Sequence, residues 1–159
     1  MGSNIPWGIC CTDGSGISAL VWLDEDHPDA LVGREFIHGI NDCYSLVRDW
    51  YKLERGITLM NFARGMDWWY HGEDLYDSNF ERAGFCTVSM DELQVGDVLL
   101  FKVRSEVTNH AAVYTGTNEI LHHLFHRCSG YDGLAKWNRV INRAVRFQKT
   151  LNTNHTGTL

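Results

Sequence analysis

Two strand-like runs joined by a short turn constrain the fold of this chain more than any other feature. The runs are 110–114 and 120–124, and Gly116, Thr117 and Asn118 stand between them. Runs of this length around a glycine-containing turn of a few residues are typical of a β-hairpin. The chain is therefore expected to build an antiparallel sheet around this hairpin.

The length of the turn decides which histidine shares a face with His110. Side chains alternate along a strand, so His110 and Ala112 point to the same face. A three-residue turn places His122 opposite Ala112, whereas a two-residue turn shifts the register by one and places His123 there. Both registers are open at this point, and Gly116 favours the three-residue turn and hence His122.

A helix is expected ahead of the hairpin. Asn41 and Asp42 precede a segment whose apolar residues recur at helical spacing, which is typical of a helix start. The helix is predicted to run from Cys43 to about Glu54, with Gly56 as its stop signal. A helix N-terminus carries roughly +0.5 of an elementary charge, which should stabilise a cysteine thiolate. Cys43 is therefore the candidate nucleophile.

The remaining segments are less regular. Residues 60–85 are rich in aromatic side chains and are expected to form short helices and loops that belong to a satellite core or wall a binding groove. A buried strand is predicted at 97–103, and a last strand or short helix at 137–147. The predicted domain organisation is an N-terminal arm or linker at 1–33, one domain at 34–149, and a flexible tail at 150–159.

Composition excludes several classes of partner. The net charge of −6, with no block of Lys or Arg, argues against nucleic acid or an anionic membrane. No apolar run approaches the roughly 18 residues that cross a bilayer, and no signal-peptide pattern opens the sequence, so a soluble chain not exported by that route is expected. The five cysteines lack disulfide-framework or zinc-ribbon spacing, and all but Cys43 are expected to be plain free thiols.

Cys43 and the hairpin histidines can supply the parts of a cysteine-nucleophile mechanism. Such a mechanism needs a thiol, an imidazole that takes its proton, and a third group that orients the imidazole. His110 is the expected base and His122 the orienting residue. Backbone N–H groups at the helix start, including that of Cys43, are candidate oxyanion donors.

A metal site is the competing interpretation of the histidines. His122, His123 and His126 are close in sequence, and His110 could join them. However, the His-Glu-x-x-His pattern is absent, and adjacent histidines on a strand point to opposite faces. No metal and no cofactor are therefore expected. Asp97, at the start of a predicted strand, is expected to cap a turn.

Four motifs in this order resemble those of the NlpC-type cysteine peptidases. They are Asp42-Cys43-Tyr44-Ser45-Leu46-Val47, Gly96-Asp97-Val98-Leu99-Leu100-Phe101, His110-Ala111-Ala112-Val113-Tyr114 and Ile120-Leu121-His122. The resemblance covers roughly residues 34–147. Further likeness to the phage branch of the family lies in three places: His38-Gly39, Tyr44-Ser45 and the stretch from Trp68 to Tyr76.

The resemblance implies a papain-like α+β fold in which the cysteine helix packs on an antiparallel sheet. It implies Cys43 as nucleophile, His110 as base and His122 as the orienting residue. It also implies cleavage of D-amino-acid-containing peptide bonds in the stem peptides of bacterial cell walls.

The resemblance also bears on substrate binding. Many family members carry a tyrosine before the catalytic cysteine, and its hydroxyl sits near the thiol. Phe36 stands at that place here. The expected substrate-binding residues are Phe36, Asp42, Tyr44, Trp68 and Trp69.

The phage branch implies a place at the phage tail tip, or in the host cytoplasm during assembly, with action in the bacterial periplasm or cell wall. Its implied partners are peptidoglycan stem peptides and other phage tail proteins. Residues 5–9 resemble the end of a metallopeptidase-like domain that precedes this domain in full-length relatives, so the arm could be its remnant. The alternative function is a structural tail assembly factor with an idle triad, and acyl transfer to an amine is a lesser option.

Overall fold

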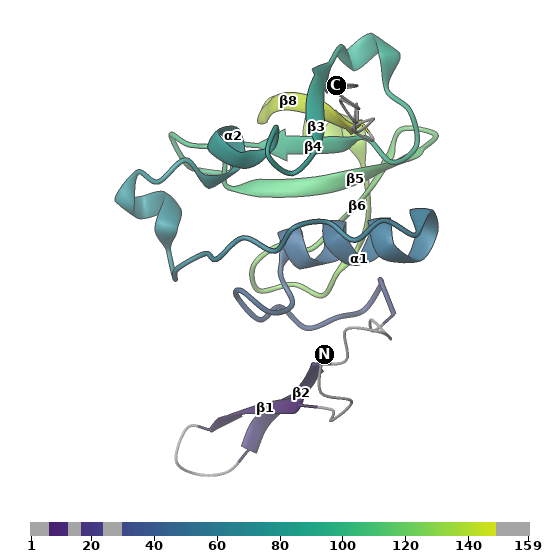
Figure 1. Cartoon of the computed structure of the whole chain (residues 1–159). Coiled ribbons are helices and arrows are strands. Elements are labelled where there is room, and N and C mark those ends of the chain that lie inside the picture. The colour runs from purple at the N-terminus through teal and green to yellow at the C-terminus, as the bar shows by residue number, and fades with distance from the viewer. Residues whose placement is uncertain (1–6, 13–16, 24–29, 149–159) are drawn as a thin grey trace, which may run out of the picture. The chain divides into compact units, whose positions relative to one another are not determined.

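The computed structural model describes residues 7–12, 17–23 and 30–148, in two compact units, Met1–Ala30 and Leu31–Leu159 (Figure 1). In the first unit, β1 (Trp7–Thr12) and β2 (Ile17–Leu23) pair as antiparallel strands. The sequence analysis expected only an arm or linker here and missed this pair. The tail expected at 150–159 lies outside the described residues, and the domain boundaries proposed from the sequence stay predictions.

The second unit is an α+β domain in which α1 (Cys43–Arg55) lies along one face of a six-stranded antiparallel sheet (Figure 1). This confirms the predicted fold class. The strands follow one another across the sheet in the order β3 (Phe85–Val88), β8 (Ile141–Phe147), β4 (Val98–Phe101), β5 (His110–Gly116), β6 (Glu119–His122) and β7 (Gly130–Gly133).

Helix α1 begins and ends where its capping residues stand. The Asp42 carboxylate accepts a hydrogen bond from the backbone N–H of Ser45 at 2.9 Å, which satisfies one of the free donors of the first turn. Gly56 adopts a left-handed conformation with φ of 64° and closes the C-terminus. The predicted helix from Cys43 to about Glu54 is confirmed.

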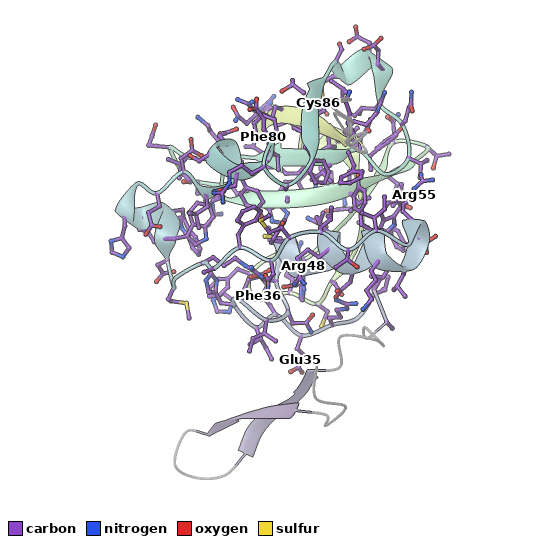
Figure 2. All side chains as sticks on the ribbon, in the orientation of Figure 1. Glu35, Phe36, Arg48, Arg55, Phe80 and Cys86 are labelled. Atoms are coloured by element: carbon purple, nitrogen blue, oxygen red, sulfur yellow. The ribbon has the colours of Figure 1, made fainter. Side chains whose placement is uncertain are left out.

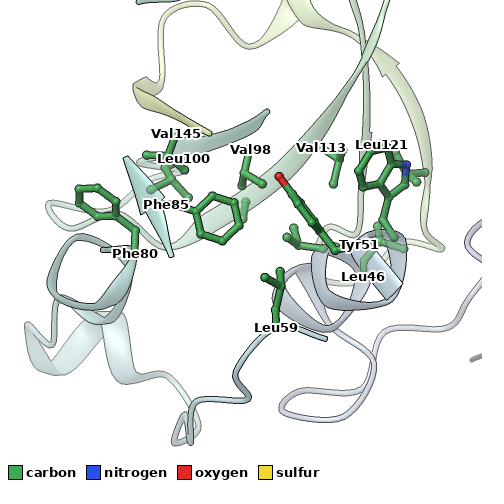
Figure 3. Close-up of a cluster of buried hydrophobic side chains, with 13 residues drawn as sticks. Leu46, Tyr51, Leu59, Phe80, Phe85, Val98, Leu100, Val113, Leu121 and Val145 are labelled. Carbon is green, nitrogen blue, oxygen red and sulfur yellow. The ribbon is translucent and has the colours of Figure 1, made fainter. Parts of the chain in front are cut away.

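Side chains alternate along the central strands of the sheet, and they are buried on both of its faces by two hydrophobic clusters. On β4 all four residues are buried, which confirms the predicted buried strand. One face meets α1 in a hydrophobic cluster (Figure 3) that includes Leu46, Val47, Trp50, Val98, Leu100, Ala111, Val113, Leu121 and Val145. The other face holds a second cluster of Leu99, Phe101, Ala112, Ile120, Leu134 and Ala144.

The β5–β6 hairpin pairs Ala112 with His122. The register that the sequence favoured is therefore confirmed, and His110 and His122 share a face. His123 is fully buried elsewhere, with its ring centroid 5.2 Å from that of Phe36. The register thus separates the two adjacent histidines.

The turn that gives this register has a different length from the predicted three residues. Thr117 and Asn118 alone form the loop, with φ of 48° and 60°, and Gly116 pairs with Glu119. Two positive φ values are typical of the turn whose twist matches that of paired strands. A register irregularity just before Gly116 adds the extra residue that a three-residue turn was expected to supply.

The other elements match the prediction in part. Short helices occupy the aromatic-rich segment, as expected: a 3-10 helix η1 (Trp68–His71) and α2 (Leu75–Asn79). Two more 3-10 turns are η2 (Met90–Glu92) and η3 (Leu134–Lys136). Within the segment 137–147, residues 141–147 form the strand β8, whereas β3 and β7 were not predicted. In the described part of the chain no helix is long and apolar enough to cross a membrane.

Candidate active site

Cys43 is the first residue of α1, and its side chain is partly exposed. Its Sγ lies 3.2 Å from the hydroxyl oxygen of Tyr76, and either atom can donate the hydrogen bond. Tyr76 belongs to α2, 33 residues further along the chain. The nearest side-chain partner of the candidate nucleophile is therefore a hydroxyl from a separate element.

A polar network around Asp77 holds α2 in place. The hydroxyl of Thr108 donates to the Asp77 carboxylate at 2.6 Å, and Arg143 of β8 forms an ion pair with it at 2.9 Å. Thr108 is fully buried and lies two residues before His110. The same network therefore positions the helix that carries Tyr76 and the strand start that carries His110.

The thiol of Cys43 rests in its neutral form. Burial, together with the negative charge of Asp42, raises its pKa to about 11. The hydrogen bond from Tyr76, the backbone N–H of Ala111 and the charge of Arg64 lower the pKa by less. The stabilised thiolate expected from the helix N-terminus was wrong, because that expectation left out desolvation and the carboxylate that caps the same helix.

Asp42 is buried beneath the start of α1 and paired with Arg64. The guanidinium Nε donates to the carboxylate at 2.6 Å and Nη2 at 3.0 Å, while the N–H groups of Ser45 and Gly39 donate at 2.9 and 2.8 Å. Burial acts to raise the pKa of Asp42, but Arg64 and these N–H groups outweigh it and lower the pKa. Asp42 is thus an ionised cap, and its substrate-binding role stays a prediction.

His110, at the start of β5, and His122, at the end of β6, face each other across the hairpin. Their Nε2 and Nδ1 atoms lie 3.1 Å apart, within hydrogen-bond distance. Burial lowers the pKa of His110 to about 3 and that of His122 to about 4, and neighbouring histidines add to the fall for His110. Both imidazoles are therefore neutral near pH 7, and each keeps one ring nitrogen with a lone pair.

Cys43 is hydrogen-bonded to Tyr76, and His110 to His122. Both pairs lie next to the start of β5. Ala111, whose N–H acts on the Cys43 sulfur, directly follows His110 in the strand. Among the described residues no hydrogen bond joins Sγ to His110. Because Nε2 of His110 bonds to His122, its Nδ1 is the nitrogen left for a proton from elsewhere. The three catalytic roles assigned from the sequence stay predictions on this geometry.

The other expected substrate-binding residues divide into two groups. Tyr44 and Trp68 lie near Tyr76, with ring centroids 6.2 and 6.0 Å from it. Trp69 packs edge-on against Trp68, with 5.7 Å between ring centroids, and lies 6.1 Å from the ring of His38.

Phe36, labelled in Figure 2, belongs to the loop before α1 and packs edge-on against His123 and Phe125, each at 5.2 Å. The hydroxyl near the thiol therefore comes from Tyr76, a residue that the sequence analysis named as part of an aromatic-rich stretch resembling the phage branch, without a role at the thiol.

A mostly apolar pocket adjoins the thiol's partners. Tyr44, Tyr76 and Ala111 line it, and so does Arg64. Its remaining lining is largely core side chains of α1, the sheet and the 62–85 segment, among them Val47, Phe62, Trp68, Leu75, Phe80, Phe85, Val98, Leu100 and Val145. Side chains of the aromatic-rich segment 60–85 therefore line this pocket as well as packing in the core.

The histidines do not gather into a metal site. Within residues 30–148 no group of three or more His, Cys, Asp or Glu side chains is arranged to hold a metal ion. Asp97 acts as expected, since its carboxylate accepts a hydrogen bond from the backbone N–H of Gln94 at 2.8 Å and closes a turn. It also pairs with Arg146 at 2.8 Å.

Replacing Tyr76 by phenylalanine is expected to slow alkylation of Cys43 by iodoacetamide. The hydroxyl lowers the thiol pKa, and a lost hydrogen bond of about 1 kcal/mol corresponds to a roughly fivefold smaller thiolate fraction. The rate at pH 9 is measured by mass spectrometry of the peptide that contains Cys43. Tyr114→Phe, at the other end of β5, is the control and should leave the rate unchanged. An equal rate in the Tyr76→Phe variant would show that the hydroxyl does not act on the thiol.

Comparison with known proteins places this arrangement among its relatives. Residues 33–145 match the model of the NlpC/P60 family. The chain is 40% identical over 138 residues to the tail tip assembly protein K of Escherichia phage lambda, an alignment that covers 86% of this chain and 65% of that protein. A tail tip assembly protein K from another Escherichia phage is 29% identical over 125 residues, which cover 74% of this chain and 49% of that protein. The alignments thus span about half to two thirds of the length of these relatives.

Solved structures share the fold at low identity. The NlpC/p60 domain of the peptidoglycan hydrolase SagA superimposes with a TM-score of 0.53 at 17% identity, over 74% of this chain and 90% of that one. An NLP/P60-family protein similar to lipoprotein from Staphylococcus aureus gives a TM-score of 0.50 at 24% identity, over 74% of this chain and 37% of that one. With the family match spanning most of the described domain, the chain belongs to the NlpC/P60 family.

Proposed function

We propose that this chain is a phage tail-associated cysteine peptidase that hydrolyses peptide bonds in peptidoglycan stem peptides. One observation carries the proposal: the partly exposed Cys43 starts α1, which packs beside β5, and His110 at the start of β5 is hydrogen-bonded to His122 of β6, both imidazoles being neutral. Similarity to tail tip assembly proteins supports the tail as its place and other tail proteins as partners. Local opening of the cell wall, assembly of the tail tip, or both would follow.

The proposed reaction begins with a neutral thiol and a neutral base. His110 Nδ1 accepts the thiol proton as Sγ bonds to the carbonyl carbon of the scissile peptide. The carbon–nitrogen bond then breaks, the proton passes to the leaving amine, and a thioester remains on Cys43. Water, deprotonated by the same imidazole, hydrolyses the thioester and restores the thiol.

The developing oxyanion needs donors that stay protonated. The backbone N–H of Cys43 at the helix start is one, and the Tyr76 hydroxyl is a second, since burial and the neighbouring Cys43 hold the Tyr76 pKa well above its usual value. Tyr76 thus fills the place of a side-chain donor that the sequence alone did not reveal.

The test is incubation of the purified chain with tripeptide, tetrapeptide and cross-linked stem-peptide fragments, read by mass spectrometry. A shorter product is expected with the native chain and none with Cys43→Ala, which removes only the sulfur atom from a partly exposed site. The mass of the product identifies the bond. A product that persists in Cys43→Ala would overturn the proposed mechanism.

A catalytically idle tail assembly factor is the second candidate. The specific observation in its favour is the raised thiol pKa, about 11, beside a histidine whose pKa is lowered to about 3, because such a pair does not ionise at rest. Absence of product from every stem-peptide fragment, with a folded chain, would favour this candidate. Pull-down of tail proteins by both native chain and Cys43→Ala would then be expected.

A further inference from the structure

An aspartate on the edge strand faces the outer nitrogen of His122. Asp132 lies on β7, opposite Ile120 of β6, so it is a diagonal neighbour of His122 on the same face of the sheet. Its Oδ2 atom lies 3.9 Å from His122 Nε2. The exposed fractions of the two side chains are 15% and 8%. This carboxylate therefore acts on His122 from a partly buried site at the edge of the sheet.

The carboxylate of Asp132 is held in place by η3 and the residue after it. Trp137 donates from Nε1 to Oδ2 at 3.2 Å, and Lys136 forms an ion pair with Oδ1. The Trp137 ring also packs against both histidines, with centroids 4.9 Å from His122 and 6.0 Å from His110. One short segment thus orients the carboxylate and covers the imidazoles that it faces.

Each neutral imidazole carries its proton on one nitrogen, and the two rings share a hydrogen bond. If His122 is protonated on Nε2, its Nδ1 accepts from His110 Nε2–H, and His110 Nδ1 keeps a lone pair. If His122 is protonated on Nδ1, it donates to His110 Nε2 and the His110 proton sits on Nδ1. Only the first arrangement leaves His110 able to take a proton from a thiol.

We propose that Asp132 is a positioning residue that selects the first arrangement. A negative charge 3.9 Å from Nε2 favours the tautomer with a proton on that atom. The hydrogen bond at 3.1 Å then transmits this choice to His110. The order is therefore Asp132, His122, His110, and it leaves a lone pair on Nδ1 of His110.

The other ionisable groups around His122 do not attract a proton to Nε2, because they are either positively charged or neutral. Arg127 and Lys136 are cationic, and His123 and His110 are imidazoles. Asp132 is the anion among the groups that act on His122 in the described residues. Its own pKa is lowered, chiefly by the hydrogen bond from Lys136, so it is ionised near pH 7. Loss of Asp132 would leave His122 in a cationic surrounding with no preference for Nε2–H.

The test uses nitrogen-15 NMR of histidine-labelled protein without substrate, which reports the tautomer of each ring. The native chain is expected to show Nε2–H for both His110 and His122. Asp132→Ala should lose this preference, and Asp132→Asn, which retains a partner for Trp137, should weaken it. Glu119→Gln, which removes an exposed carboxylate at the other end of β6, is the control and should leave both tautomers unchanged.

The kinetic part of the inference rests on the proposed peptidase function. In Asp132→Ala, kcat is expected to fall about tenfold to a hundredfold with KM nearly unchanged, a loss of the size seen for the outer partners of metal-binding histidines. Unchanged tautomers in both Asp132 variants would overturn the assignment whatever the activity. A native chain that cleaves no stem peptide, but whose tautomers change in Asp132→Ala, would refute the proposed function and support the positioning role.

Discussion

Replacing His110 by glutamine is expected to slow stem-peptide cleavage at pH 7 by a factor of roughly 10²–10⁴, the usual contribution of a general base. The physical reason is the thiol's pKa of about 11, which leaves almost no thiolate for an attack without a base. Glutamine is close to histidine in size and keeps a polar group for His122. The measurement is kcat/KM from the rate of product formation at low substrate concentration.

The pH dependence of the cleavage rate of His110→Gln shows whether His110 acts as the base. Without a base, the rate depends on thiolate that forms in solution, so it should rise about tenfold per pH unit up to the pKa of Cys43. The native chain should show a much weaker rise over the same range. His71→Gln, an exposed histidine at the end of η1, is the control and should behave as the native chain. A His110→Gln variant with native kcat/KM would show that His110 is not the base.

Replacing Asp42 by alanine is expected to lower the free energy of unfolding by about 3–5 kcal/mol, the usual loss when one partner of a buried ion pair is removed. The Arg64 side chain is 8% exposed and would remain charged beneath the helix. The change also removes the N-cap of α1, whose loss alone costs about 1 kcal/mol. Urea unfolding followed by circular dichroism gives the difference.

Two matched variants separate the causes of this loss. Asp74→Ala removes the cap of α2, which accepts from the N–H of Asp77 at 3.2 Å, and it should cost about 1 kcal/mol. Asp42→Asn keeps an oxygen for the cap of α1 and removes the charge, so it isolates the ion pair. It should also speed alkylation of Cys43, because the Asp42 charge raises the thiol pKa. Equal losses in Asp42→Ala and Asp74→Ala would contradict the role of the ion pair.

Local signals in the sequence sufficed for the elements that carry the site. The limits of α1 depend on a capping carboxylate, a helical stripe and a glycine with positive φ, all within one short segment. The pairing of Ala112 with His122 also depends on few residues, because a hairpin closes over a short loop. The turn itself was predicted wrongly, since a bulge and a two-residue loop give the same register as a three-residue loop.

The edge strand β7 could not be predicted from the spacing of apolar residues. Strand β7 consists of Gly130, Tyr131, Asp132 and Gly133, with no apolar alternation, and it exists because β6 offers a free edge. The carboxylate that β7 brings to His122 could therefore not be predicted. Tyr76 lay within a segment marked as aromatic, but no spacing rule connects a residue of α2 with a thiol 33 positions earlier.

By itself the sequence determined the limits of α1 and the register of the hairpin, and so where the candidate residues Cys43, His110 and His122 stand, because capping, helical periodicity and hairpin register act over a few residues. The tertiary structure alone decided the state of those groups. The neutral thiol, the neutral histidines, the Tyr76 hydroxyl beside the sulfur and the carboxylate beyond His122 all result from burial and from contacts between distant segments. Desolvation and charge depend on everything packed around a group, and that surrounding exists only once the chain has folded.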